Sequence, residues 1–229
     1  MPKQIKTLER VSMFGALDRA TMEKINRRCT WREVKAKEWV IDYQDHGMDV
    51  FFVVAGSVRV LIYSTSGREV ILADIAQDEF FGELAPIDGH PRSAGVLAMS
   101  DALVATMPGA VFMEILSTYA GVAMHVLKLL AARVRLLDNR VLEYSTLQVR
   151  QRISCELLRL AQRDPNDARR GIIAPKPTHS EIAARISTHR EAVAREMKLL
   201  EREGCIQRNR TGLVLPDIPR MVERLQNEE

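Results

Sequence analysis

Residues 80–94 read FFGELAPIDGHPRSA and carry the most specific chemistry in the sequence. A glycine at position 82 frees backbone N–H groups for an anion, and an arginine followed by a hydroxyl, Arg92-Ser93, suits one phosphate. Glu83 stands nine residues before the arginine, where its carboxylate can accept a hydrogen bond from a ribose hydroxyl. The segment therefore predicts a site for a ribose phosphate ligand.

Short runs rich in β-branched residues surround this segment between residues 39 and 107. They include VFFVVAG (50–56), SVRVLIY (57–63) and REVILADI (68–75), with Ser66-Gly67 as the turn of a hairpin. Strands this closely spaced, with no helix-length segment between them, indicate an antiparallel sandwich or barrel that can hold a pocket. A short helix over residues 17–28, with Asp18 as its N-cap, is expected before them.

After Pro108 the apolar period changes to about 3.5 residues, which predicts one long helix of some forty residues. Six apolar residues recur at spacings of three and four and share one narrow seam: Leu127, Leu130, Val134, Leu137, Val141 and Tyr144. The seam could pack against the chain's own β-domain or against a second copy. Its charged flanks favour a parallel coiled-coil dimer; they are Arg133, Arg135, Asp138, Asn139 and Arg140.

The C-terminal part contains two capping-box patterns, each of which indicates the start of a helix. Thr178-His179-Ser180-Glu181 and Thr188-His189-Arg190-Glu191 predict helices over 181–186 and 189–203, joined by a short turn. Gly204 ends the second helix, and residues 205–215 read as a hairpin. The sequence therefore predicts a winged helix-turn-helix.

One side of the second predicted helix carries base-reading residue types. Arginine can bind guanine through two hydrogen bonds and glutamate can accept from cytosine, so Arg190, Glu191 and Arg195 suit the major groove. Lys198 and Arg208 suit phosphate contacts. For an isolated helix, such charges are more often a solvated face with i, i+4 ion pairs. The predicted wing and capping boxes favour a DNA-binding face here.

Together, GELAPIDGHPRSA and the helix-turn-helix resemble the cyclic-AMP receptor and FNR (CRP/FNR) family of bacterial transcription regulators. The resemblance runs from about Phe14 to Leu215. It implies an α+β fold: an N-terminal antiparallel β-roll that binds cyclic nucleotides (1–108), a dimerisation helix (109–147) and a winged helix-turn-helix (148–229). The implied ligand is cyclic AMP, bound by the cassette residues Gly82, Glu83, Leu84, Arg92, Ser93 and Ala94.

In the family, Glu83 would bind the ribose 2′-hydroxyl, and Arg92 and Ser93 the cyclic phosphate. The implied DNA contacts of a TGTGA-like palindromic site are Thr188, His189, Arg190, Glu191, Arg195 and Lys198. The enteric cyclic-AMP receptor has Thr-Ser facing the purine, whereas this sequence has Leu137-Asp138 followed by Asn139. Asp138 can accept from adenine or guanine and Asn139 serves either, so cyclic GMP stays a candidate.

Composition limits the remaining choices. The 229 residues are 46% hydrophobic and 28% charged, typical of a globular protein of one or two domains. The net charge is +4 from residue 149 onward and −1 before it, which favours nucleic acid at the C-terminal end. No signal-like or membrane-spanning stretch is evident, so a cytoplasmic location without a membrane partner is expected.

No catalytic triad, carboxylate pair or metal-ligand motif suggests an enzyme. RNA polymerase is a partner implied by the family alone. Two alternatives stay open: a regulator of this fold that senses redox state or a haem-bound gas through Cys29, Cys155, Cys205 or His125, and a nucleotide-binding module that acts on a partner enzyme. An exposed loop is the preferred interpretation of His46 among Asp42, Asp45 and Asp49.

Overall fold

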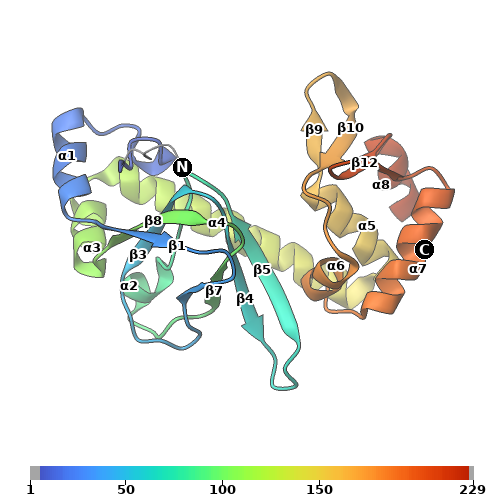
Figure 1. The fold of residues 1–229 in the computed structure, drawn as a ribbon, viewed down its shortest axis with the longest axis horizontal. Coiled ribbons are helices and arrows are strands. Elements are labelled where there is room, and N and C mark those ends of the chain that lie inside the picture. The colour runs from blue at the N-terminus through green and yellow to red at the C-terminus, as the bar shows by residue number, and fades with distance from the viewer. Residues whose placement is uncertain (1–5, 227–229) are drawn as a thin grey trace. The chain divides into compact units, whose positions relative to one another are not determined.

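The computed structural model describes residues 6–226, and the chain divides into two compact units. Met1–Arg135 form the first unit and Leu136–Glu229 the second, so the boundary lies inside the longest helix, α4 (Ala120–Thr146) (Figure 1). Each unit has a hydrophobic core of its own. The assignment of separate nucleotide-binding, dimerisation and DNA-binding roles to residues 1–108, 109–147 and 148–229 stays a prediction.

Two four-stranded antiparallel sheets build the first unit. Their strand orders are β1-β8-β3-β6 and β2-β7-β4-β5, as the antiparallel expectation requires. The elements in chain order are η1 (Ser12–Phe14), α1 (Arg19–Arg27), β1 (Thr30–Val34), β2 (Trp39–Ile41), β3 (Val50–Ala55), β4 (Val58–Tyr63), β5 (Glu69–Ile75), β6 (Phe80–Phe81), α2 (Leu84–Asp88), β7 (Gly95–Ala98), β8 (Ala102–Met107) and α3 (Gly109–Thr118). The predicted hairpin is confirmed between β4 and β5, and Asp18 caps α1 by accepting from Thr21 N at 2.9 Å.

A chain of four phenylalanines crosses the core of the first unit. Ring centroids lie 5.5 Å apart for Phe14 and Phe52, 5.9 Å for Phe52 and Phe80, and 6.5 Å for Phe80 and Phe112. Full burial of such a side chain contributes about 1.5–3 kcal/mol. Because Phe80 lies in β6, this packing fixes the strand that leads directly into Gly82 and Glu83.

The expectation of one continuous helix after Pro108 is wrong at residue 119. α3 and α4 are separate helices that meet at an angle of 110°, and Tyr119 between them has extended backbone angles (φ −117°, ψ 92°). Ser117 and Thr118 donate their hydroxyls to Glu114 O at 2.9 and 2.7 Å, a local alternative to the helical ladder. The break lets Phe112 pack into the core while α4 leaves in another direction.

No single helix in the described part of the chain is long and apolar enough to cross a membrane; only α3 and α4 taken together reach that composition.

The second unit contains the predicted helix-turn-helix and wing. Beyond the end of α4, its elements are α5 (Val149–Leu160), β9 (Gln162–Asp164), β10 (Asp167–Ile173), α6 (His179–Arg185), α7 (Arg190–Arg202), β11 (Gln207–Arg208), β12 (Leu213–Leu215) and α8 (Ile218–Gln226). The strands form one antiparallel sheet in the order β11-β12-β10-β9. The sequence did not predict the β9–β10 hairpin or α8, because both follow short polar stretches with little hydrophobic periodicity.

Only one of the two predicted capping boxes is formed. Thr178 Oγ1 accepts from Glu181 N at 3.1 Å, and Glu181 Oε2 accepts from Thr178 N at 2.7 Å. The second box is wrong, because α7 begins one residue later, with His189 as its N-cap and no side-chain cap. Ser187, with φ of 52°, turns the chain tightly before this point, and Thr188 N donates to Ala183 O at 3.0 Å.

Candidate functional site

Gly82 stands at the end of β6 with a positive φ of 81°. A Cβ at this position would lie 2.9 Å from Arg92 Nη1, closer than real Cβ atoms come to a neighbour, and 3.1 Å from Asp49 O, tighter than most Cβ contacts. Only glycine therefore combines this backbone conformation with the close approach of the Arg92 side chain. The spacing seen in the sequence between residues 82 and 92 has a direct steric basis.

Arg92 is folded inward and is only 5% exposed. Its Nη1 donates to Gly82 O at 2.8 Å and its Nη2 to Asp49 O at 2.7 Å, while the guanidinium carbon lies 5.6 Å from the centre of the Phe51 ring. Among residues 6–226, the buried Nε of Arg92 has no hydrogen-bond partner. A buried guanidinium held by carbonyl oxygens keeps both its charge and a spare donor for an anion.

Electrostatics at Arg92 combine two opposed effects. Burial lowers the pKa of its guanidinium, whereas the carboxylates of Asp45, Asp49 and Glu83 oppose that change. Arginine does not lose its proton near neutral pH in proteins, so the side chain stays charged. None of these carboxylates is among its hydrogen-bond acceptors, which are backbone oxygens.

Glu83 is almost completely buried, at 1% exposure, and forms an ion pair with Arg133 from α4. Burial of a carboxylate costs free energy unless the group is paired, and Arg133 supplies that partner and orients the Glu83 side chain. The sequence predicted Arg133 only as a charged flank of the seam and did not predict this ion pair. The unmatched buried carboxylate of the cassette was the only sequence signal for such a partner.

The other predicted ligand residues differ in exposure. Ala94 is buried, whereas Ser93 and Leu84 are exposed. Asp138 and Asn139 are exposed on the part of α4 that belongs to the second unit. Their roles in reading the base stay predictions.

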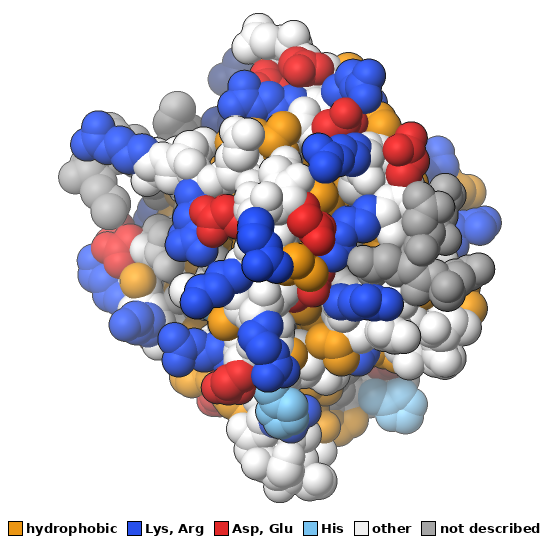
Figure 2. All heavy atoms as spheres, turned by 90° about the vertical axis from the view of Figure 1, so that its right-hand side faces the viewer, with side chains coloured by type: hydrophobic (Ala, Val, Ile, Leu, Met, Phe, Trp, Pro, Cys, Tyr) orange, Lys and Arg blue, Asp and Glu red, His pale blue; other side chains and the backbone are white. Residues whose placement is uncertain are grey.

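The predicted base-reading side chains lie on the exposed side of α7. Arg190, Glu191, Arg195 and Lys198 are exposed, whereas Val193, Met197 and Leu200 are buried in the core of the second unit. Figure 2 looks onto the side of the molecule that carries the C-terminal helices and shows many Lys and Arg side chains across it. The helix therefore presents charge outward while its apolar side anchors it.

The seam residues of α4 are largely exposed in the single chain. Leu127, Val134, Leu137 and Val141 are each between 55% and 64% exposed, whereas Leu130 packs partly on the first core. An apolar row of this kind is unusual on a helix surface without a partner. Tyr144, the last predicted seam residue, is engaged within the chain, since its hydroxyl donates to Arg185 O at 3.1 Å.

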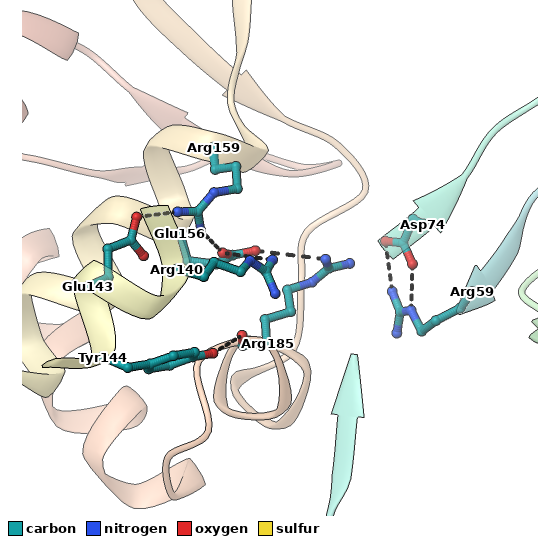
Figure 3. Close-up of polar contacts among 8 residues, drawn as sticks. All are labelled: Arg59, Asp74, Arg140, Glu143, Tyr144, Glu156, Arg159 and Arg185. Atoms are coloured by element: carbon teal, nitrogen blue, oxygen red, sulfur yellow. Dashed lines mark hydrogen bonds and ion pairs between the residues drawn. The ribbon is translucent and has the colours of Figure 1, made fainter. Parts of the chain in front are cut away.

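A buried ionic cluster joins the end of α4 to α5 and α6 within the second unit (Figure 3). Glu156 of α5 is fully buried and pairs with Arg159, with Arg140 of α4 at 3.6 Å and with Arg185 of α6 at 3.8 Å. Glu143 of α4 adds an ion pair to Arg159 at 2.5 Å. Burial opposes the charge of Arg159, but the two carboxylates outweigh it and raise its pKa. Arg140, predicted as a charged flank of the seam, is thus buried and paired within the chain.

The cysteines offer little reactivity. Burial raises the pKa of the Cys29 thiol to about 11, and burial followed by Glu143 raises that of Cys155. Cys205 is buried in the second core. Within residues 6–226, no group of three or more His, Cys, Asp or Glu side chains is arranged to hold a metal ion.

Two family models match the chain in the regions described above. The cyclic nucleotide-binding domain matches residues 31–119, which contain the cassette. The Crp-like helix-turn-helix domain matches residues 151–224, which contain α6, α7 and the wing.

Curated relatives extend the similarity over most of the chain. The cAMP-activated global transcriptional regulator Vfr of Pseudomonas aeruginosa is 30% identical over 189 residues, 81% of this chain and 88% of Vfr. The cAMP-activated global transcriptional regulator CRP of Pasteurella multocida is 28% identical over 196 residues, 85% of this chain and 94% of CRP.

Solved structures share the fold at lower identity. A CooA variant from Carboxydothermus hydrogenoformans superposes with a TM-score of 0.78 at 17% identity and covers 97% of both chains. The c-di-GMP responsive global regulator CLP of Xanthomonas campestris has a TM-score of 0.69 at 20% identity, covering 87% of this chain and 99% of CLP.

Proposed function

This chain belongs to the CRP/FNR family of DNA-binding transcription regulators, and we propose that cyclic AMP is the effector that sets its affinity for DNA. The observation that carries the proposal is Arg92, a buried cation with a spare donor, next to the buried carboxylate of Glu83. An anionic phosphate with a ribose hydroxyl on one side matches this pair of charges. The names of the relatives, CRP and Vfr, support cyclic AMP.

Cyclic GMP is the second candidate effector. Neither a carboxylate at Asp138 nor an amide at Asn139 selects adenine over guanine, because each can accept from the amino group of either base. Leu137, in place of a hydroxyl residue, cannot hydrogen-bond a base. The nucleotide preference therefore depends on residues that differ from those of the enteric receptor.

The proposed active form is a homodimer that pairs along the exposed seam of α4. Two recognition helices about 34 Å apart would then enter successive major grooves of a palindrome with TGTGA-like half-sites. Linkage makes the effect reciprocal: if nucleotide tightens DNA binding, DNA tightens nucleotide binding by the same factor. RNA polymerase is the proposed partner in transcription, and the cytoplasm the proposed location.

Calorimetric titration of the protein with cyclic AMP and cyclic GMP in parallel tests this function. We expect Arg92→Ala to abolish binding without unfolding the protein, while Arg19→Ala, a change at an exposed arginine of α1, leaves binding unchanged. DNA binding with each nucleotide, measured by fluorescence anisotropy, then tests the coupling.

Unchanged nucleotide affinity in Arg92→Ala would contradict the assignment of residues 82–94 as the phosphate-binding segment. A visible haem band without nucleotide binding would replace the effector, and a lack of DNA binding even at low salt would point to a partner enzyme.

A further inference from the structure

One loop holds both the main chain and the side chain of Arg92. This loop, residues 42–49, connects β2 to β3. Arg92 N donates to Asp45 O at 2.8 Å, and Gln44 N donates to Arg92 O at 3.2 Å. Arg92 Nη2 donates to Asp49 O at 2.7 Å. Because these loop contacts use backbone atoms of the loop, the loop's own side chains can be changed while the contacts stay in place.

The carboxylate of Asp45 lies close to the same guanidinium. Gly47 separates the two groups: a Cβ on Gly47 would lie 3.1 Å from Asp45 Oδ2 and 3.5 Å from Arg92 Nη2. Burial lowers the pKa of Arg92, and of the three carboxylates that oppose this change Asp45 has the largest effect, ahead of Asp49 and Glu83. The Asp45 side chain itself is exposed. The proposed phosphate site therefore has a negative charge beside its buried cation.

We propose that Asp45 is a specificity-determining residue of this site, which disfavours doubly charged phosphate monoesters relative to the singly charged cyclic phosphodiester. The inference rests on the proposed function, since it takes Arg92 as the group that binds the phosphate. A cyclic phosphodiester carries one negative charge, whereas a phosphate monoester such as 5′-AMP carries close to two above pH 7. The repulsion from Asp45 grows in proportion to the charge of the ligand. Asp45 thus acts against a second ligand charge more strongly than against one.

The size of the effect follows from Coulomb's law. Two unit charges about 7 Å apart in a water-like medium change an equilibrium roughly threefold. This factor is the gain that we expect for a singly charged ligand when Asp45 loses its charge. A doubly charged ligand should gain about the square of it, roughly tenfold. Salt should reduce both gains, because the Asp45 carboxylate is exposed to solvent.

Calorimetry of the 229-residue protein at low salt tests the inference, with cyclic AMP titrated directly and 5′-AMP measured by its displacement of cyclic AMP. We expect Asp45→Asn to bind cyclic AMP about threefold more tightly and 5′-AMP about tenfold more tightly than the unmodified protein does. Asp45→Glu keeps the charge and should keep both affinities. Cyclic GMP with 5′-GMP should show the same factors, because the phosphate carries the ligand charge.

Asp42→Asn is the matched control, because Asp42 is an exposed aspartate of the same loop and is not among the carboxylates that act on Arg92. It should leave both affinities unchanged. Three results would overturn the role of Asp45 while nucleotide binding itself stands: weaker or unchanged binding of cyclic AMP by Asp45→Asn, equal gains for the two ligands, or no displacement by 5′-AMP from this variant. Equal gains in Asp42→Asn would do the same. Absence of cyclic nucleotide binding by the unmodified protein overturns the inference and the proposed function together.

Discussion

The two units bury charge in opposite ways. Among the residues that the structure describes in the first, Arg92 has backbone carbonyls as its hydrogen-bond acceptors and an Nε without a partner, and Glu83 pairs with Arg133. In the second, Glu156 alone is shared by three arginines. In the first arrangement the buried cation donates only to carbonyl oxygens among the described residues, whereas in the second each arginine pairs with a carboxylate of the chain.

This difference distinguishes the proposed binding site from the ionic cluster that stabilises the second unit. A buried charge is tolerated when partners compensate its desolvation, and the extent of that compensation decides what a substitution changes. Removal of a charge from the cluster around Glu156 should lower the free energy of unfolding. Removal from the cassette should cost ligand affinity.

Glu156→Gln should give the largest effect. It leaves two buried arginines, Arg140 and Arg185, and the partly buried Arg159 around a neutral amide, which should lower the free energy of unfolding by about 3–5 kcal/mol. Urea denaturation followed by circular dichroism measures this loss. Glu201→Gln, which breaks the partly exposed pair with Arg208, should cost only about 0–1 kcal/mol. Equal losses in the two variants would contradict the contrast between the units.

The ribose contact of Glu83 should give the next largest effect. A hydrogen bond to a charged group contributes about 1.5–3 kcal/mol, so 2′-deoxy cyclic AMP should bind about 10- to 150-fold more weakly than cyclic AMP. In Glu83→Gln that penalty should shrink towards the value for a neutral hydrogen bond, because the amide carries no charge. Calorimetry with both ligands on both proteins measures the difference. A penalty that is the same in both proteins would show that Glu83 serves only Arg133.

The exposed charges of α7 should act on sequence recognition and leave stability unchanged. Arg190→Ala should weaken binding to the cognate duplex by about 1–3 kcal/mol with little change on a scrambled duplex. Lys198→Ala, the comparison, should weaken binding on both duplexes and reduce the salt slope by about 1. Anisotropy titrations over a range of salt concentrations distinguish these outcomes. Uniform weakening by Arg190→Ala would make it a phosphate contact.

Cys29 should give the smallest effect on function. With a thiol pKa of about 11, its thiolate is scarce at pH 8 and increases only as the pH rises towards that value. Alkylation by iodoacetamide should therefore run about a hundredfold more slowly than for free cysteine, as mass spectrometry can follow. Cys29→Ala should leave nucleotide and DNA binding intact. Rapid modification that changes DNA affinity would restore the redox alternative.

Local patterns predicted the elements whose signals are local. The alternation in residues 50–75, the cap at Asp18 and the box at Thr178 each depend on neighbours in the chain, and the corresponding strands and helices are present. The chemistry of Gly82 and Arg92 likewise predicted their meeting, which the steric fit at Gly82 explains.

Long-range pairing set the limit of that approach. Arg133 and Arg140 looked alike as charged neighbours of an apolar seam, yet each finds a buried carboxylate supplied by a different segment. The sequence did not predict the break at Tyr119, because Ser117, Thr118 and Tyr119 are only mildly unfavourable in a helix. The end of α3 is set by its packing on the core, which is a long-range contact.

The position of Arg133 bears on any attempt to engineer this regulator. Arg133 holds Glu83, and Val134, the next residue, is among the exposed apolar side chains of α4. The proposed ligand site and the proposed subunit interface thus share a single helical turn. A library that alters effector choice by varying this turn would also alter assembly, so selection should measure both properties. Biosensor designs that graft a new pocket should keep residues 133 and 134 unchanged.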